Sequence, residues 1–156
     1  MHFLSHDGGL VDASCIAVVA ALQHFRRPDV SVEGEKVIIH TLVERVPVPL
    51  SILHVPICVT FSFYHGGEVC LVDATMLEEQ LREGDMTITL NKFGDLCQIA
   101  KAGGLPIAAL ALLQCARLAL VKVQGIAAII QKRLEEDAEA RTRRDNLLES
   151  KADNER

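Results

Sequence analysis

The chain has 156 residues and a net charge of −5 at neutral pH, and 49% of its residues are hydrophobic. This length suits one compact domain with a substantial core, and the hydrophobic content excludes a generally disordered chain. The acidic balance argues against a strongly basic nucleic-acid-binding domain, although it is compatible with a local basic strip.

The first segments predict a strand, a turn and a helix. Residues 2–5 predict a short strand, and the turn at residues 6–9 leads into a helix that is capped by Asp12 or Ser14 and runs to about Phe25. A strand of this length is not stable without neighbours in a sheet. We therefore expect the chain to be an N-terminally truncated part of a larger domain.

A hairpin and an extended connector are expected next. Residues 30–32 and 36–40 predict two strands on either side of Glu33-Gly34. Residues 44–49 contain two prolines, which disfavour helix in the residues before them. We expect this segment to connect two lobes.

The second half predicts more strands. Apolar and polar side chains alternate most clearly over residues 57–64, which is typical of a strand with one buried face. Residues 86–91 alternate in the same way. Residues 68–72 and 96–100 predict further strands that follow glycine-containing turns.

Two helices and a tail complete the expected elements. A short polar helix is expected at residues 75–82, and Pro106 suits the first turn of a long helix that continues to about Ala140, with a bend at Gly125. Residues 141–156 are almost all charged or polar, so they predict a solvated tail that frays.

Cysteine and histidine patterns argue against a metal site. No Cys-x-x-Cys pair occurs, and we expect reduced, buried thiols in a cytosolic or nuclear protein at Cys15, Cys58, Cys70, Cys97 and Cys115. The histidines never occur as His-x-His, and only His2 and His6, in a segment that is not expected to be helical, are four residues apart, so we expect no metal and no cofactor. The longest apolar stretch, residues 105–130, carries polar and charged side chains, which argues against a membrane-spanning helix.

The turn at residues 6–9 is the segment most informative about chemistry. A glycine turn that leads into a helix is a common way to hold a phosphate, because glycines let the backbone approach the anion and the free amides point toward it. No arginine or lysine occurs in this turn or in the first turn of the expected helix. The sequence therefore predicts the scaffold of an anion site without its positive charge.

A set of short motifs, spread in order over about residues 2–135, carries a family resemblance. The motifs are Asp7-Gly8-Gly9 before Ala13-Ser14, residues 24–30, 47–52, 56–59 and 71–75, Glu78-Glu79 and residues 102–104. Together they resemble the RNase PH family, and within it the non-catalytic RNase PH-like ring subunits of the eukaryotic RNA exosome.

The resemblance implies an α+β, RNase PH-like two-lobed βαβα fold of the ribosomal-protein type, here without its N-terminal part. We expect residues 1–46 to be the remainder of the first lobe, residues 47–140 the second lobe, and residues 141–156 a charged flexible tail. The implied partners are other RNase PH-like ring subunits, KH-domain cap subunits, an associated hydrolytic exoribonuclease and RNA, with no membrane. The implied localisation is the nucleus and nucleolus, and also the cytoplasm.

The resemblance also bears on catalysis. Active relatives carry Gly-Gly-Thr-Arg in the turn, with the arginine on the phosphate, whereas this chain has Gly8-Gly9-Leu10-Val11 followed by Asp12. A carboxylate would then stand where an anion enters, and two like charges about 4 Å apart repel by several kcal/mol at intermediate dielectric constant. We therefore expect the turn to reject phosphate.

Two acidic residues are vestigial catalytic candidates. Active relatives carry two spaced aspartates, the later one followed by methionine, and Asp85-Met86 matches this later position while Glu79 lies at the earlier one. An acidic group there would protonate a leaving oxygen or bind a metal. The alternative interpretation is a solvated acidic helix face that includes Glu78 and Glu83.

Basic residues in turns are candidates for RNA contact. We single out Arg26, Arg27 and Lys101, with Lys92 nearby in another turn, because such side chains attract phosphates independently of sequence. The alternative is that they are ordinary solubility residues, or that Arg26 and Arg27 cap the end of the helix.

Three functions are compatible with these observations. The preferred one is a non-catalytic core ring subunit of the RNA exosome, which scaffolds the ring and helps thread RNA for 3′-to-5′ processing and degradation. The first alternative is a phosphate-dependent 3′-to-5′ exoribonuclease that uses Glu79 and Asp85. The second is an α/β domain that scaffolds an unrelated assembly.

Overall fold

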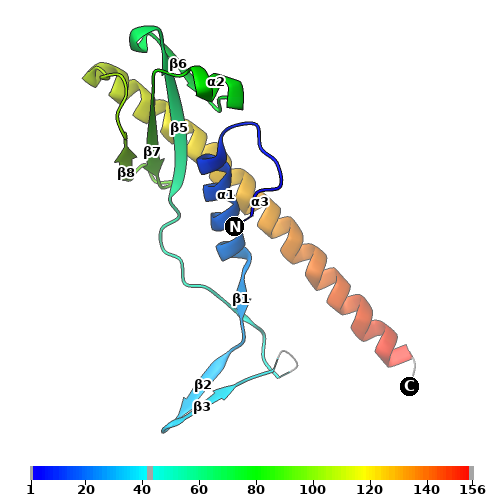
Figure 1. The fold of residues 1–156 in the computed structure, drawn as a ribbon. Coiled ribbons are helices and arrows are strands. Elements are labelled where there is room, and N and C mark those ends of the chain that lie inside the picture. Colours follow the sequence, from blue (N-terminus) through cyan, green and yellow to red (C-terminus); the bar gives the residue numbers. More distant parts are fainter. Residues whose placement is uncertain (1, 42–43, 155–156) are drawn as a thin grey trace.

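An antiparallel sheet with a long helix across one face is the centre of the molecule (Figure 1). The computed structural model describes residues 2–41 and 44–154, with side chains up to Arg143, and in this part the sheet has four strands in the order β6-β5-β7-β8. Their bounds are Val69–Val72 for β6, Ile57–Tyr64 for β5, Gly84–Leu90 for β7 and Leu96–Ala100 for β8. These are the strands that alternation and turn residues predict.

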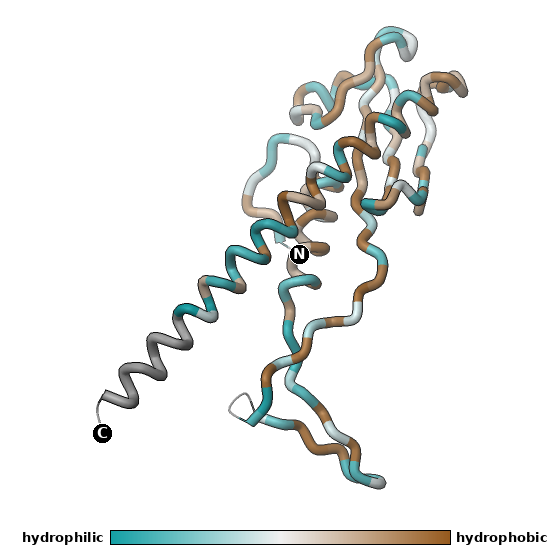
Figure 2. Tube along the Cα trace, turned by 180° about the vertical axis from the view of Figure 1, so that it is seen from behind, coloured by the Kyte–Doolittle hydropathy of each residue, from teal (hydrophilic) through white to brown (hydrophobic). Residues whose placement is uncertain are grey.

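The core lies between this sheet and helix α3 (Ala109–Asn154). Alternate residues of β5 and β7 are buried on the face toward the helix, as the apolar–polar pattern predicts: Ile57, Val59, Phe61, Phe63, Met86, Ile88 and Leu90. The helix contributes residues spaced by four or seven, which form one buried stripe: Cys115, Ala119, Val123 and Ile130. Figure 2 shows that the half of α3 over the sheet is mainly apolar and that the chain becomes hydrophilic beyond it.

Apolar character alone does not make α3 a membrane helix. Among the described residues it is the one helix that is long and apolar enough to cross a membrane, over residues 109–143. A core helix passes the same test, and the buried stripe against the sheet accounts for part of the apolar content.

Helix α1 (Leu10–His24) starts earlier than predicted. Its N-cap is Gly9, which has a left-handed backbone (φ 61°) and gives no side-chain cap, so the prediction that Asp12 or Ser14 caps the helix is wrong. The Ser14 hydroxyl donates instead to the Leu10 carbonyl inside the helix. The helix lies beside β5, and Val19 joins the core.

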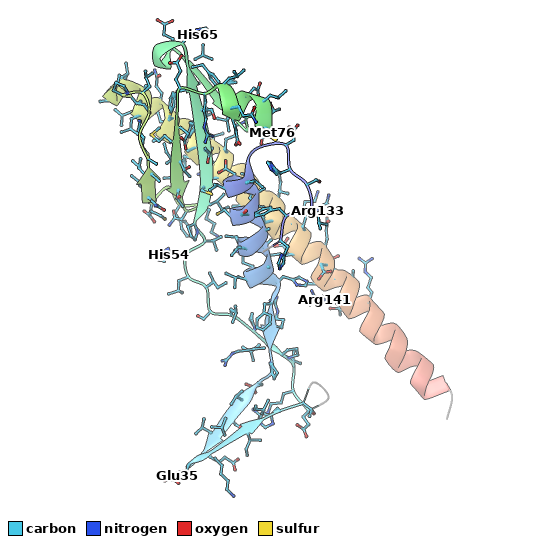
Figure 3. All side chains as sticks on the ribbon, in the orientation of Figure 1. Glu35, His54, His65, Met76, Arg133 and Arg141 are labelled. Carbon is cyan, nitrogen blue, oxygen red and sulfur yellow. The ribbon has the colours of Figure 1, made fainter. Side chains whose placement is uncertain are left out.

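The strand predicted at residues 2–5 is also wrong. Residues 2–9 form neither helix nor strand, and they run as a loop past the start of α2 (Met76–Leu81) into α1 (Figure 3). The reason is the absence of a partner, because the strands at residues 30–39 pair with each other and stand away from the sheet (Figure 1).

The predicted hairpin is confirmed, and a short ladder joins it to the rest of the molecule. Strands β2 (Val30–Glu33) and β3 (Lys36–Ile39) are antiparallel, with Glu35 at the tip (Figure 3). At the base, β1 (Arg26–Arg27) pairs with β4 (Val48–Pro49), which lies in the segment predicted as a connector. The division into two lobes at residues 46 and 47 stays a prediction.

Helix α3 differs from the prediction at both ends. It begins at Ala109 and not near Pro106, because the preceding loop is tied to the residue before β7: the Leu105 amide donates to the Glu83 carbonyl at 3.3 Å. The helix passes through Gly125 and beyond Ala140 to the last described residues, so residues 141–154 of the predicted charged tail are helical, and the flexibility of this tail stays a prediction. Residues 155 and 156 of that tail lie outside the described residues.

Charge spacing explains why α3 continues past the core. Ion pairs four residues apart join Arg141 to Asp137 at 2.6 Å and Arg143 to Glu139 at 3.2 Å. Such pairs stabilise a solvated helix by about 0.2–0.5 kcal/mol each. Composition alone suggested a loose tail, whereas the spacing of the charges favours a helix.

Candidate functional site

The glycine turn before α1 packs against α2. A Cβ on Gly8 would overlap the carbonyl oxygen of Ala74 and lie 2.8 Å from the carbonyl carbon of Thr75, and Gly8 has φ +90°. The Asp7 carboxylate accepts a bond from the Met76 amide at 3.4 Å, and Figure 3 shows Met76 beside this loop. Only glycine fits such an approach, so the turn and α2 form one unit.

An internal carboxylate occupies the predicted anion site. The Gly9 amide donates a hydrogen bond to Oε1 of Glu79 at 3.0 Å, across a sequence separation of 70 residues. Gly9 is the N-cap of α1, where free amides and the helix dipole favour a negative charge. Glu79, one of the two vestigial catalytic candidates, therefore lies at the position that a phosphate would take.

A cation that the sequence analysis missed lies beside this carboxylate. Arg82 directs Nη1 toward Glu79 Oε1 at 3.8 Å and Nη2 toward Asp85 Oδ1 at 3.8 Å. The structure thus brings both vestigial candidates to one guanidinium. The three side chains are 28–39% exposed, so each pair contributes at most about 1 kcal/mol to stability. The sequence did carry a signal for this cluster, because Arg82 is three residues from each of the two acids.

Asp12 has a different role from the predicted one. Its carboxylate accepts hydrogen bonds from the Thr60 amide at 2.7 Å and from the Thr60 hydroxyl at 2.8 Å. Thr60 is the residue next to the end of the β5–β6 ladder, which begins at Phe61. Asp12 therefore joins α1 to β5, and the expectation that its carboxylate faces an incoming anion is wrong.

The other acids nearby make local hydrogen bonds. Glu78 forms a capping box with Thr75, whose amide donates to the Glu78 carboxylate at 2.7 Å and holds the pKa of that carboxyl below its usual range. The Glu83 carboxylate accepts from the amides of His65 at 3.1 Å and Gly66 at 2.9 Å. These acids shape the turns around the site and are not an unpartnered acidic face.

The carboxylates of the chain itself oppose the entry of an anion at this site. The Arg82 guanidinium already faces two carboxylates, and an entering anion would have to displace Glu79 from the Gly9 amide. Among the described residues, no group of three or more His, Cys, Asp or Glu side chains is arranged to hold a metal ion.

The candidate RNA-contact residues do not lie together. The Arg26 guanidinium donates to the carbonyls of Gln23, His24 and Phe25 at 2.7–3.1 Å, which is the helix-capping role considered as an alternative. Arg27 follows in β1, at the base of the hairpin, whereas Lys101 follows β8 at the far end of the molecule (Figure 1). The Lys101 ammonium donates to the nearby Gly103 carbonyl. RNA contact by these residues stays a prediction.

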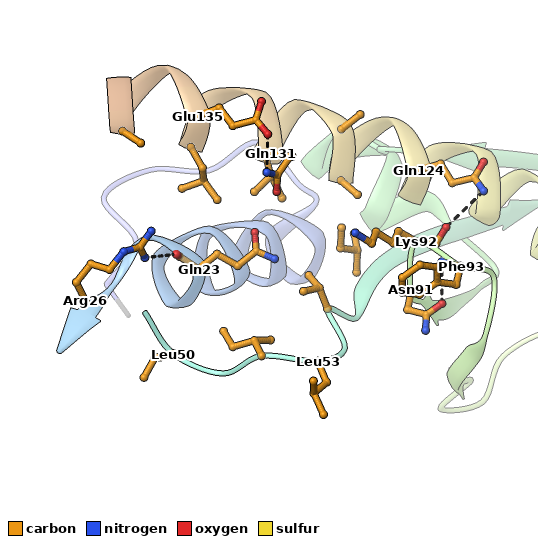
Figure 4. A pocket seen from close by; sticks show the side chains of 18 residues that line it. Gln23, Arg26, Leu50, Leu53, Asn91, Lys92, Phe93, Gln124, Gln131 and Glu135 are labelled. Carbon is orange, nitrogen blue, oxygen red and sulfur yellow. Dashed lines mark hydrogen bonds between the residues drawn. The ribbon is translucent and has the colours of Figure 1, made fainter. Parts of the chain in front are cut away.

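A groove of about 730 Å³ lies between α3, the end of α1 and the chain leading into β5 (Figure 4). Its apolar lining includes Leu50, Ile57 and Ala127, while Lys92 and Glu135 provide charge. The sequence analysis did not predict this groove, because segments far apart in the chain build it.

The comparisons with known proteins agree with this architecture. Residues 54–122 match the family model of the RNase PH C-terminal domain, described as the 3′ exoribonuclease family, domain 2. Exosome complex component rrp45 of Schizosaccharomyces pombe is 54% identical over 156 residues, which cover 100% of this chain and 53% of that protein. The human RRP45 is 46% identical over 141 residues, which cover 90% of this chain and 32% of that protein. The chain spans about half the length, or less, of these curated relatives.

Solved structures confirm the fold. The Archaeoglobus fulgidus exosome with RNA bound to its active site has a chain with a TM-score of 0.61 and 22% identity, and the match covers 80% of this chain and 44% of that one. An archaeal exosome core gives the same TM-score and identity over 85% of this chain and 47% of its own. The predicted RNase PH-like α+β class is therefore confirmed. Residues 54–122 belong to domain 2 of the RNase PH (3′ exoribonuclease) family.

Proposed function

We propose that the chain is part of a core ring subunit of the RNA exosome, which supports 3′-to-5′ RNA processing and degradation by scaffolding the ring and threading RNA. The RNAs would be maturing rRNA and mRNA in turnover. The observation that carries this proposal is the 54% identity, along the whole chain, to a protein named as an exosome component.

The proposed partners follow from the same relationship. They are other RNase PH-like ring subunits, KH-domain cap subunits, an associated hydrolytic exoribonuclease and RNA, in the nucleus, the nucleolus and the cytoplasm. Co-purification of the tagged chain from cells tests this assembly, and recovery of the other ring subunits is the expected result. Recovery of an unrelated assembly without them would contradict the proposal.

We further propose that the chain cuts no RNA itself. Two observations support this: the Glu79 carboxylate is bonded to the Gly9 amide, and Arg82 is shared between Glu79 and Asp85. Phosphorolysis needs a cation that is free to hold the attacking phosphate. Here the carboxylates of the chain itself compete with phosphate for that charge.

A phosphorolysis assay on a reconstituted ring tests this second part. RNA is incubated with the ring, with and without inorganic phosphate, and nucleoside diphosphates are measured. We expect no phosphate-dependent release that depends on this chain. Release that is lost on Asp85→Ala, but kept in the matched control Glu35→Gln at the hairpin tip, would support the phosphorolytic alternative instead.

A further inference from the structure

Two cysteines far apart in the sequence meet beside the core. The sulfur of Cys70 in β6 lies 4.0 Å from the sulfur of Cys115 in α3, across a separation of 45 residues. Cys70 is the register partner of Phe63, a core residue, so its side chain points to the same face of the sheet as Phe63, toward α3. Both thiols are free. Cys115 is buried as expected, whereas the expectation of a buried thiol is wrong for Cys70, and also for Cys97, because both residues are exposed.

The strand that carries Cys70 lies at an edge of the sheet. Within the described part of the chain, β6 is an edge strand that is paired on one side with β5. A disulfide needs the sulfurs about 2.05 Å apart, so they must approach each other by about 2 Å. Rotation of the Cys70 side chain and a slight shift of an edge strand can supply this approach without moving the buried stripe of α3.

We propose that Cys70 and Cys115 form a reversible intramolecular disulfide when the protein meets a hydroperoxide. The Cys70 thiolate attacks one oxygen of hydrogen peroxide, the O–O bond breaks, and Cys70 sulfenic acid and one water result. The Cys115 sulfur then attacks the Cys70 sulfur, the S–O bond breaks, and a second water leaves after taking up the thiol proton. Two thiols are oxidised to one disulfide while one peroxide is reduced to two waters.

The surroundings make this reaction slow. Although Cys70 is exposed as a residue, partial desolvation of its thiol beside Cys115 raises its pKa to about 12, and burial raises the pKa of Cys115. The thiolate is the attacking species, and a raised pKa leaves little of it at neutral pH. The disulfide therefore forms during sustained exposure to peroxide and not during a brief pulse of it. Once formed, it closes a long loop and fixes the edge strand to α3, which reduces the entropy of the unfolded chain.

Peptide mapping of the whole chain under non-reducing conditions tests the proposal. After incubation with excess hydrogen peroxide, we expect a cross-linked peptide that joins Cys70 to Cys115, has lost two hydrogens and is cleaved by dithiothreitol. Cys70→Ser and Cys115→Ser each abolish it. Cys97→Ser, at an exposed position in β8, is the matched control and leaves it intact.

The melting temperature gives a second test, which does not need the Cys115→Ser variant at the buried position. We expect the Tm of the oxidised chain to exceed that of the reduced chain by about 5–10 °C, with no such difference for Cys70→Ser. Sulfinic acid at Cys70 without a cross-link would overturn the proposal. A bond between Cys15 and Cys58, or between two chains, in place of the Cys70–Cys115 bond would overturn it equally.

Discussion

Replacement of Asp12 by alanine tests how α1 is held against the sheet. The substitution removes the hydrogen bonds to the Thr60 amide at 2.7 Å and to the Thr60 hydroxyl at 2.8 Å. A hydrogen bond to a charged group contributes about 1.5–3 kcal/mol, and a donor left without a partner has a further cost. Asp12 and Thr60 are both half-buried, so we place the total at the lower end, about 3 kcal/mol.

Urea unfolding followed by circular dichroism measures this loss. A loss of about 3 kcal/mol in a chain of this size corresponds to a Tm lower by roughly 6–12 °C. Asp12→Asn keeps one acceptor oxygen and should lose about half as much free energy. In a double-mutant cycle with Thr60→Val, which removes the hydroxyl and keeps the amide, we expect a coupling energy of about 1 kcal/mol.

The matched control is Glu35→Gln, which removes a carboxylate at the tip of the hairpin, far from α1 (Figure 3). It should change the free energy of unfolding by less than about 0.5 kcal/mol. If Asp12→Ala behaves like this control, the carboxylate does not hold α1 to β5. The assignment of Asp12 to architecture would then be wrong.

Two further predictions concern the turn and α2. Gly8→Ala should destabilise the fold by roughly 3 kcal/mol or more, because its Cβ overlaps the Ala74 carbonyl, whereas Gly34→Ala, also at positive φ but in open space, should cost only about 1 kcal/mol in thermal melts. The hydrogen bonds from Thr75 lower the folded-state pKa of Glu78, so the stability it contributes is present above its ordinary pKa of 4.5 and is lost as the pH falls through its lower folded-state pKa. Glu78→Gln should therefore be less stable than the wild type at pH 7, and melts should converge toward pH 3.

Local patterns were enough to predict the strands of the sheet. The alternation in β5 and β7 is visible within eight residues, and the turns between the strands contain glycine or asparagine. The same approach failed at residues 2–5, because a short apolar segment becomes a strand only if another strand lies beside it. At the end of α3, composition alone did not indicate that the helix continues past Ala140, which the spacing of charges favours.

The site could be predicted in part. The sequence identified the glycine turn, Glu79 and Asp85, because family motifs carry them. It could not show that the Glu79 carboxylate bonds to Gly9, since that contact depends on how α2 packs against the turn after the chain has folded. Asp12 was misassigned for the same reason, because its partner Thr60 is 48 residues away.

The turn has the geometry of an anion site, but the charges around it do not favour an anion. The N-terminus of α1 supplies about half a positive charge and Arg82 supplies one, while Glu79 and Asp85 together supply two negative charges. The cluster is therefore already slightly negative before any ligand arrives. A phosphate carrying one to two further negative charges gains little there unless a carboxylate leaves or takes up a proton. The internal carboxylate pairs with the Gly9 amide at the start of α1, so this amide has a partner without a bound anion.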